Sequence, residues 1–222
     1  MEKKWNIWKI GFFVALYIFC ICCAELMGAK TFPLMNIFGY HLNASVGIFF
    51  IPIIYSVNDV INEIYGPKVT RSLVRTWIFI IVLILLSSIL FTWLPPSTRF
   101  AVTDPSYKAI FGVSIRISLA SLIAFGIGDF LDVYLFSKIR KMFGNKRLWL
   151  RNNLSNIISE WIDTIIFMTI AFYSIWLGFH SNLTFLMSIV IPYWILKCCA
   201  SFIETPFVYL GVHWLRKKDK EK

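Results

Sequence analysis

A hydrophobic segment of this chain, WLRNNLSNIISEWID, carries four polar residues at helical spacing. Asn152, Asn156, Glu160 and Asp163 fall on one face of a helix with a period of 3.6 residues. Carboxylates accept hydrogen bonds and amides both accept and donate them, so this face suits a flat ligand with several N–H groups. The hydrophobic run continues to about Leu177, which is long enough to cross a bilayer. Because ionisable groups at membrane depth cost about 2.5–3.5 kcal/mol each, the stripe predicts a ligand site or pathway inside a helix bundle.

The composition is that of an integral membrane protein. The 222 residues are 58% hydrophobic and 18% aromatic, more apolar surface than a water-soluble domain of this length can bury. The net charge of +10 does not indicate nucleic acid, because Lys and Arg cluster between hydrophobic spans. The five cysteines lie within spans and lack the spacing of a disulfide framework or a zinc site. We expect one membrane domain, residues 1–222, with no cofactor and no metal.

Six hydrophobic segments predict an all-α bundle of six transmembrane helices. Their approximate bounds are 8–27, 44–64, 73–94, 112–137, 154–177 and 183–211. Pro192 and Pro206 lie in the last segment, which we expect to be kinked, tilted or broken. Seventeen Lys and Arg lie on one set of connections and at the two ends of the chain, against only Lys30, Arg99 and Lys108 on the other set. This asymmetry predicts that both termini are cytoplasmic.

Three further spans carry polar residues at helical spacing. The charged and amide groups among them are Asn58, Asp59, Asn62 and Glu63 in span two, Asp129 and Asp132 in span four, and Lys197 and Glu204 in span six. At a rise of about 1.5 Å per residue, the acids lie between mid-membrane and the cytoplasmic surface. Spans two, four, five and six are therefore predicted to surround a polar cavity, and span three to face lipid. Span one has only Glu25, near its outer end, and is ambiguous.

Structural explanations of these residues stay open beside the functional one. Glu63 could pair with Lys68 or Arg71 at the interface. One of the deep acids could form a salt bridge with Lys197, and Arg116 is expected to reach the interface by snorkelling. Seven acids face two bases in these spans, so some carboxyl groups are protonated or bind a hydrogen-bond-donating or cationic ligand. Acidic pairs in spans two and five, which run in opposite directions, suggest an inverted 3+3 repeat.

Four segments resemble the successive motifs of the VUT family, whose best-known members transport queuosine precursors. They are SVNDVINEIYGPKVTR (56–71), GDFLDVYLFSKIRK (128–141), WLRNNLSNIISEWIDTIIF (149–167) and ETPFVYLG (204–211). The resemblance implies a six-helix inner-membrane importer of a 7-deazaguanine base: 7-cyano-7-deazaguanine, its aminomethyl relative or queuine. The residues that match motif positions are Asp59, Asn62, Glu63, Asp132, Arg151, Asn152, Asn153, Asp163, Thr164 and Pro206.

The chain departs from the family pattern at three places. Glu160 stands where the pattern has Gln, Glu204 where Asp is usual, and Gly128-Asp129-Phe130 where Gln-Tyr or a similar pair often precedes the Asp-Val pair. An ionised carboxylate only accepts hydrogen bonds, so these changes favour an aminomethylated or otherwise cationic base. The candidate substrate-binding residues are Asp59, Asn62, Glu63, Asp129, Asp132, Asn152, Asn156, Glu160, Asp163, Lys197 and Glu204. A homodimer is left open, as is the coupling ion, proton or sodium.

Two other functions fit parts of the sequence. A substrate-binding membrane subunit of an ATP-driven vitamin-type uptake system would need a separate ATPase, because this chain has no P-loop. The element Gly126-Ile127-Gly128-Asp129 matches the GxGD element of intramembrane aspartyl proteases, in which two aspartates share a proton around a water. That match is short and six spans are too few for the protease family, so we expect a transporter and no enzyme.

Overall fold

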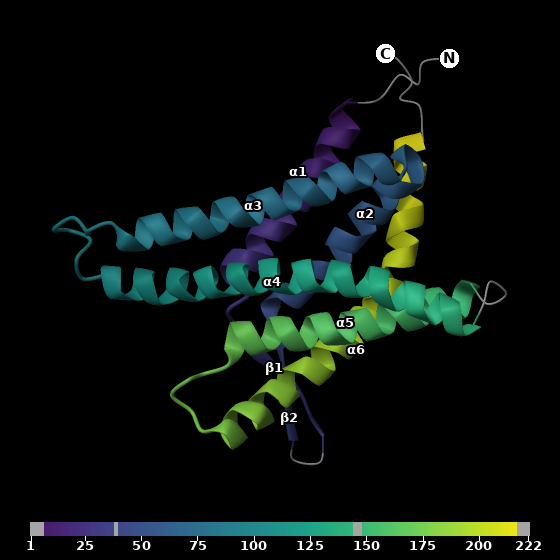
Figure 1. Cartoon of the computed structure of the whole chain (residues 1–222). Helices are drawn as coiled ribbons and strands as arrows, with labels where there is room; N and C mark the ends of the chain where they lie inside the picture. Colours follow the sequence, from purple (N-terminus) through teal and green to yellow (C-terminus); the bar gives the residue numbers. More distant parts are fainter. Residues whose placement is uncertain (1–6, 38–39, 144–147, 217–222) are drawn as a thin grey trace.

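Six α-helices, one short 3-10 helix and one β-hairpin are the elements of the described part of the chain. The computed structural model describes residues 7–37, 40–143 and 148–216. In order, the elements are α1 (Ile7–Met27), β1 (Thr31–Ile37), β2 (Tyr40–Ser45), the 3-10 helix η1 (Val46–Phe49), α2 (Ile51–Tyr65), α3 (Pro67–Trp93), α4 (Asp104–Phe143), α5 (Leu148–Phe172) and α6 (Phe179–Arg216). Figure 1 shows α3, α4 and α5 as neighbouring long helices, with α1, α2 and α6 grouped beside them.

The protein is a polytopic membrane protein. Within the described residues, five helical segments are long and apolar enough to cross a membrane: Ile7–Met27, Val46–Tyr65, Lys68–Trp93, Asp104–Gly128 and Phe179–Cys199. They correspond to five of the six predicted spans. The helix α5 covers most of the remaining predicted span, 154–177, but is not among these five. A sixth crossing, the inverted repeat and the cytoplasmic position of the termini stay predictions.

A two-stranded hairpin lies between the first two membrane helices, where the expectation of an all-α chain anticipated no strand. The strands β1 and β2 are antiparallel, and their register shifts between Pro33 and Met35. Proline has no N–H to donate to the ladder, which explains an irregularity at that point. The hairpin rests on α6, where the side-chain amide of Asn43 donates to Ser188 Oγ at 3.2 Å. The fold is therefore mostly helical, with a short β element attached to one end of α6.

Gly66 connects α2 to α3 in one residue. Its φ angle is +82°, in the left-handed region that only glycine adopts readily. Its N–H donates to the carbonyl of Asn62 at 2.9 Å and closes α2, and α3 begins with the next residue. The two helices therefore pack against each other directly after the turn.

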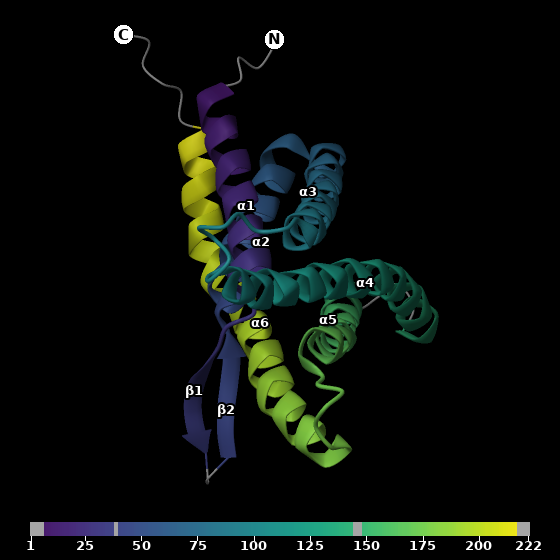
Figure 2. The same cartoon turned by 90° about the vertical axis from the view of Figure 1, so that its left-hand side faces the viewer.

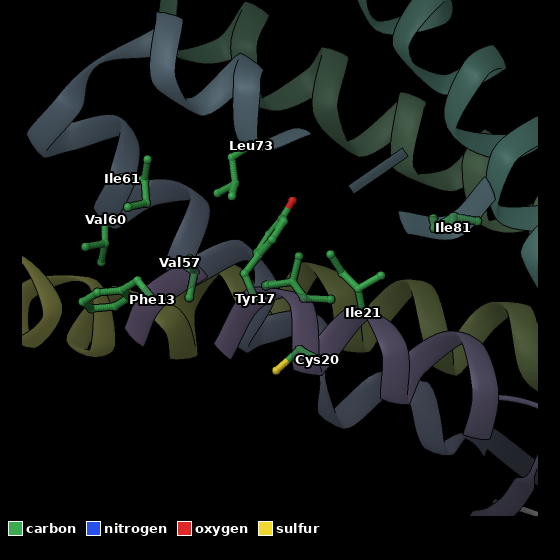
Figure 3. Packing of buried hydrophobic residues seen from close by; sticks show 10 residues of the cluster. Phe13, Tyr17, Cys20, Ile21, Val57, Val60, Ile61, Leu73 and Ile81 are labelled. Atoms are coloured by element: carbon green, nitrogen blue, oxygen red, sulfur yellow. The ribbon is translucent and has the colours of Figure 1, made fainter. Parts of the chain in front are cut away.

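The largest described cluster of buried hydrophobic residues joins α1, α2 and α3. Figure 3 shows Tyr17 of α1 at its centre, surrounded by Val57 of α2 and Leu73 of α3. Tyr17 is fully buried. The sixth helix closes this cluster through Gly211, where an added Cβ would lie 2.8 Å from Val60 Cγ2. Only a residue without a side chain allows α6 to approach α2 this closely.

The two ends of the described chain also meet in this region. Lys9 of α1 is 3% exposed, and its Nζ donates to the carbonyl of Trp214 at 3.2 Å. The same ammonium lies 5.6 Å from the centre of the Trp214 ring, within range of a cation–π interaction. Figure 2 shows the start of α1 and the end of α6 side by side.

Arg116, which was expected to snorkel to the interface, joins α4 to the end of α5. Its Nε donates to the carbonyl of Ile170 at 2.5 Å, and its Nη2 donates to the carbonyl of Tyr173. The last carbonyls of a helix have no partner within the helix and carry partial negative charge, so a guanidinium satisfies them well. Arg116 therefore has capping partners within the protein, and its position relative to the membrane interface stays a prediction.

The sixth helix is continuous through both of its prolines. Pro192 and Pro206 lie inside α6, which changes direction along its length in Figure 2. Proline removes one backbone hydrogen bond and thereby permits such a bend. Trp194 of α6 packs edge-on against Trp161 of α5, with ring centres 5.0 Å apart. The bent helix thus remains attached to α5 near the middle of its length.

Candidate substrate-binding cavity

A cavity of about 470 Å³ lies between the six helices. Each of α1 to α6 contributes to its wall, together with Gly28, Ser45 and Gly47 near the hairpin. This volume lies in the range of about 300–1,000 Å³ that is usual for small-molecule sites. The cavity is therefore large enough for a bicyclic base.

One polar part of the cavity is built around Lys197. Its Nζ donates to Asp163 Oδ2 at 2.9 Å, and the two side chains are 9% and 28% exposed. The ammonium also lies 5.7 Å from the ring centre of Tyr193, one turn earlier on α6. The salt bridge considered for one of the deep acids is thus present, with Asp163 as the acid. Because the two opposite charges compensate each other, neither requires a ligand to remain charged.

Glu160 brings a second carboxylate of α5 to the cavity. It lies three residues before Asp163, so the two side chains are on the same face of the helix. Both line the cavity wall. The thiol of Cys198 lies within hydrogen-bonding distance of Glu160 Oε2, at 3.9 Å. Thr164 is buried, and its hydroxyl donates a hydrogen bond to the carbonyl of Glu160 at 2.7 Å. This bond lies within the helical turn that carries Glu160 and Asp163.

Aromatic rings form much of the remaining wall. Trp77 of α3 and Phe125 of α4 stand edge-to-face with ring centres 4.7 Å apart, and both line the cavity. Tyr55 and Phe167 line it as well. Such rings bind flat heterocycles through stacking or edge contacts. Span three, which was expected to face lipid, is mostly exposed, but Trp77 on one of its sides lines the cavity.

The polar residues of α2 divide between two faces of that helix. Asn58 lines the cavity, whereas Asp59, Asn62 and Glu63 are exposed and do not line it. Thr70 donates its hydroxyl to Asn62 Oδ1 at 3.4 Å. Glu63 forms an ion pair with Arg216 at 3.1 Å, and both side chains are 61% exposed. The interfacial ion pair considered for Glu63 therefore exists, but with Arg216 as the base.

The side chains of five other candidates are outside the described part of the structure. These candidates are Asp129, Asp132, Asn152, Asn156 and Glu204. Their role in binding stays a prediction. Gly128, which precedes the first of them, lines the cavity, and an added Cβ there would lie 3.5 Å from Asp163 Oδ1.

Glu25 is a cavity residue that the sequence did not single out. It is 5% exposed, lines the cavity from α1, and lies beside the hydroxyls of Ser118 and Ser121 on α4. Its Oε2 has no hydrogen-bond partner among the described residues. A single acid in a span gives no periodic stripe, so helical spacing carries no signal for it. The available signal was a carboxyl group in a hydrophobic segment with no base on the same helical face.

A comparison with protein families agrees with this architecture. The family described as "Putative vitamin uptake transporter" matches residues 45–211, which is more than half of the chain. The chain belongs to this family. The match runs from the end of the hairpin through most of α6 and includes all four motif segments, so the resemblance to the VUT family is confirmed. Membership in a transporter family also sets aside the protease reading of the GxGD element, and the protein is not an enzyme.

Three curated proteins show the same relationship. A "Probable queuosine precursor transporter" of Bacillus subtilis is 35% identical over 205 residues, which cover 90% of this chain and 83% of the relative. The "Queuosine precursor transporter" of Escherichia coli is 26% identical over 142 residues, 63% of this chain and 59% of the relative. A Haemophilus influenzae protein with the same name as the first is 26% identical over 144 residues, 62% and 55% of the two chains. No solved structure matches this VUT family member significantly.

Proposed function

We propose that this protein imports a queuosine precursor, a 7-deazaguanine base, across the inner membrane. The observation that carries the proposal is the cavity of about 470 Å³, which combines three carboxyl groups, a lysine and several aromatic rings. The names of the three relatives support the same class of cargo. The candidates are 7-cyano-7-deazaguanine, its aminomethyl relative and queuine.

The lining groups complement the polar edges of such a base. Glu160 accepts hydrogen bonds from the ring and exocyclic N–H groups, and the second oxygen of Asp163 is a further acceptor. The side-chain amide of Asn58 can donate to a ring carbonyl, since an amide has both donor and acceptor atoms. Trp77 provides an aromatic surface for the flat ring system. We further assign to Asn152 and Asn156 contacts to the carbonyl or nitrile of the base.

Transport then follows from alternating access to this cavity. Pro192 and Pro206 interrupt the hydrogen bonding of α6, and this helix contributes Tyr193 and Lys197 to the cavity. Rocking of two halves of the protein about these prolines would open the cavity to one side of the membrane at a time. The helices themselves need not unfold for this motion.

Thermal stability of the purified protein in detergent tests the cargo. The panel contains guanine, 7-cyano-7-deazaguanine, its aminomethyl relative and queuine. A ligand at about a hundred times its Kd stabilises the fold by about 2.7 kcal/mol, which gives a clear rise in Tm. We expect a selective rise for one of the deazaguanines. Each variant is compared with its own ligand-free Tm, so that a general loss of stability is not mistaken for lost binding.

Matched variants show whether the cavity is responsible. Glu160→Gln and Asp163→Asn change one acceptor atom each with little change in shape, and both are expected to abolish the ligand-induced rise. Glu63→Gln is the control, because Glu63 is exposed and does not line the cavity. Unchanged binding in Asp163→Asn and Glu160→Gln would remove them from the site. If no base raises the Tm of the wild type, the cargo assignment is wrong.

Reconstitution separates autonomous import from an ATP-driven system. The purified protein alone in proteoliposomes is expected to exchange external radiolabelled base for internal unlabelled base. Exchange that requires an added ATPase partner would favour the ATP-driven vitamin-type uptake system instead. Copurification of such a partner from the native membrane would give the same answer.

A further inference from the structure

Glu25 is more enclosed than any other acid among the described residues. It is 5% exposed, and no Lys or Arg of the described chain forms an ion pair with it. Lys197, the base on the same cavity wall, pairs with Asp163 instead. The Oε2 atom of Glu25 has no hydrogen-bond partner among the described residues. A carboxylate held in this way requires a positive charge or a proton.

The oxygen atoms around Glu25 suit a proton better than a metal cation. Hard cations take about six oxygen ligands. The side chains grouped here, Glu25, Ser118 and Ser121, provide four oxygen atoms between them. A protonated carboxyl group needs fewer partner atoms than a metal cation, because it donates one hydrogen bond and accepts others. A serine hydroxyl can either accept from it or donate to it.

We propose that Glu25 carries the proton that drives uptake, so that one proton enters with each molecule of base. The proposal rests on the proposed function, because it assumes that a base occupies the same cavity. In the outward-open state, a proton from the external water binds to a carboxylate oxygen of Glu25 and forms an O–H group. In the inward-open state, that O–H bond breaks and the proton passes to cytoplasmic water, while the electron pair stays on the carboxylate.

The cavity offers a pathway for this proton, since Glu25 lies on its wall. Among the residues whose side chains the structure describes, the other titratable or charged groups on that wall or beside Glu25 are Cys22 of α1, Tyr55 of α2, Glu160 and Asp163 of α5, and Tyr193 and Lys197 of α6. Asp163 and Lys197 compensate each other, and Glu160 is assigned to the base. From α3 and the described side chains of α4 the wall contributes Trp77, Ser121 and other uncharged residues. Glu25 is therefore the carboxyl group of the described wall for which no other task is assigned.

Uptake into proteoliposomes tests the proposal, with radiolabelled 7-cyano-7-deazaguanine and its aminomethyl relative as probes. The external side is one pH unit more acidic than the interior, and the membrane potential is clamped at zero. One proton per base then supports accumulation of about tenfold in the wild type, since one pH unit equals about 1.4 kcal/mol. In Glu25→Gln the ratio is expected to fall to about onefold, while exchange of external for internal base persists, because a neutral amide resembles the protonated acid.

The controls separate this proposal from the cargo assignment. Glu63→Gln should accumulate base as the wild type does. Accumulation by Glu25→Gln at the wild-type ratio would overturn the proton assignment, and so would a wild type driven by a sodium gradient instead of a pH gradient.

A wild type that exchanges neither base contradicts the proposed function instead, and the proton site is then tested without cargo. In that case infrared difference spectra between acid and alkaline pH should show a carboxylic-acid band that Glu25→Gln lacks, and identical spectra overturn the inference.

A milder variant covers the case in which Glu25→Gln does not fold. Ser121→Ala removes a hydroxyl beside the carboxyl group and is expected to shift the pH of half-maximal uptake without abolishing exchange. An unchanged pH profile in Ser121→Ala and in the corresponding Ser118→Ala variant would contradict the proposal.

Discussion

Lys197 of α6 and Asp163 of α5 form a 2.9 Å ion pair within the wall of the cavity. The pair links the bent sixth helix to the helix that carries the polar stripe. It also leaves Glu25 as a buried cavity acid without a lysine or arginine ion pair among the described residues. The described wall holds three carboxyl groups, Glu25, Glu160 and Asp163, and one lysine, which suits a cargo rich in hydrogen-bond donors or a cationic one.

Removing one member of this pair should destabilise the protein. Lys197→Met leaves Asp163 without its base, and Asp163→Asn leaves an ammonium that is 9% exposed. Fully buried pairs lose about 3–5 kcal/mol in this way, and partial exposure of Asp163 reduces the expected loss to about 1–3 kcal/mol. Thermal unfolding in detergent measures it. The double variant should recover part of the Tm, and single variants as stable as the wild type would show that the pair contributes nothing.

Trp77 should contribute to binding of the base. The variant Trp77→Leu removes an aromatic surface that is fixed by Phe125, with ring centres 4.7 Å apart. Aromatic pairs contribute about 0.5–1.5 kcal/mol beyond their buried area, so affinity should fall by up to about tenfold. Isothermal titration or scintillation proximity measures the Kd. Trp93→Leu is the matched control, because Trp93 is 81% exposed at the end of the same helix, and equal losses in both variants would count against a role in the site.

Arg116 should be more important for stability than an ordinary arginine of a membrane protein. It donates to carbonyls of Ile170 and Tyr173 at the end of α5. Hydrogen bonds from charged groups contribute about 1.5–3 kcal/mol, so Arg116→Gln should lower the Tm by several degrees. Arg99→Gln, at an exposed loop position, should leave the Tm unchanged. The capping role would be refuted by equal Tm values for the two variants.

Gly211 should tolerate no side chain. An alanine Cβ at this position would lie 2.8 Å from Val60 Cγ2 and 3.2 Å from Phe13 Cζ, so α6 would have to move away from α1 and α2. Overpacking of this kind costs about 1–3 kcal/mol. Gly112→Ala is the control, since nothing lies within 4 Å of the added Cβ there. We expect reduced yield and Tm for Gly211→Ala only, and a stable, monodisperse Gly211→Ala protein would show that the helices adapt.

The sequence predicts the helices and part of the site because both depend on periodicity. Hydrophobic length placed the membrane helices, and the spacing of Glu160 and Asp163 put them on one face of α5, where the structure has them line the cavity. Periodicity predicts less well which way a residue points when that residue lies at the boundary between two faces of a helix. Asn58 and Asp59 are adjacent in sequence, yet Asn58 lines the cavity and Asp59 is exposed, and only the packing of α2 against its neighbours decides between them.

Contacts between segments that are distant in the sequence could not be predicted from helical periodicity. The serines beside Glu25 lie about 90 residues further along the chain, so the environment of this acid follows only from the packing of α1 against α4. The capping of α5 by Arg116 has the same origin. The hairpin was missed for a different reason, because a short connection between two membrane spans contains a proline, Pro33, and gives too few residues for a clear alternating pattern.

The contact between Lys9 and Trp214 also determines when the molecule can finish folding. The two residues are 205 positions apart, so Lys9 is synthesised well before Trp214. Until Trp214 has been made, the carbonyl and the ring that receive the ammonium are missing, and more of this charge faces water. Packing of α1 against the end of α6 therefore waits for Trp214, and nascent chains arrested before Trp214 should expose Lys9 to water-soluble amine reagents from which the folded protein shields it.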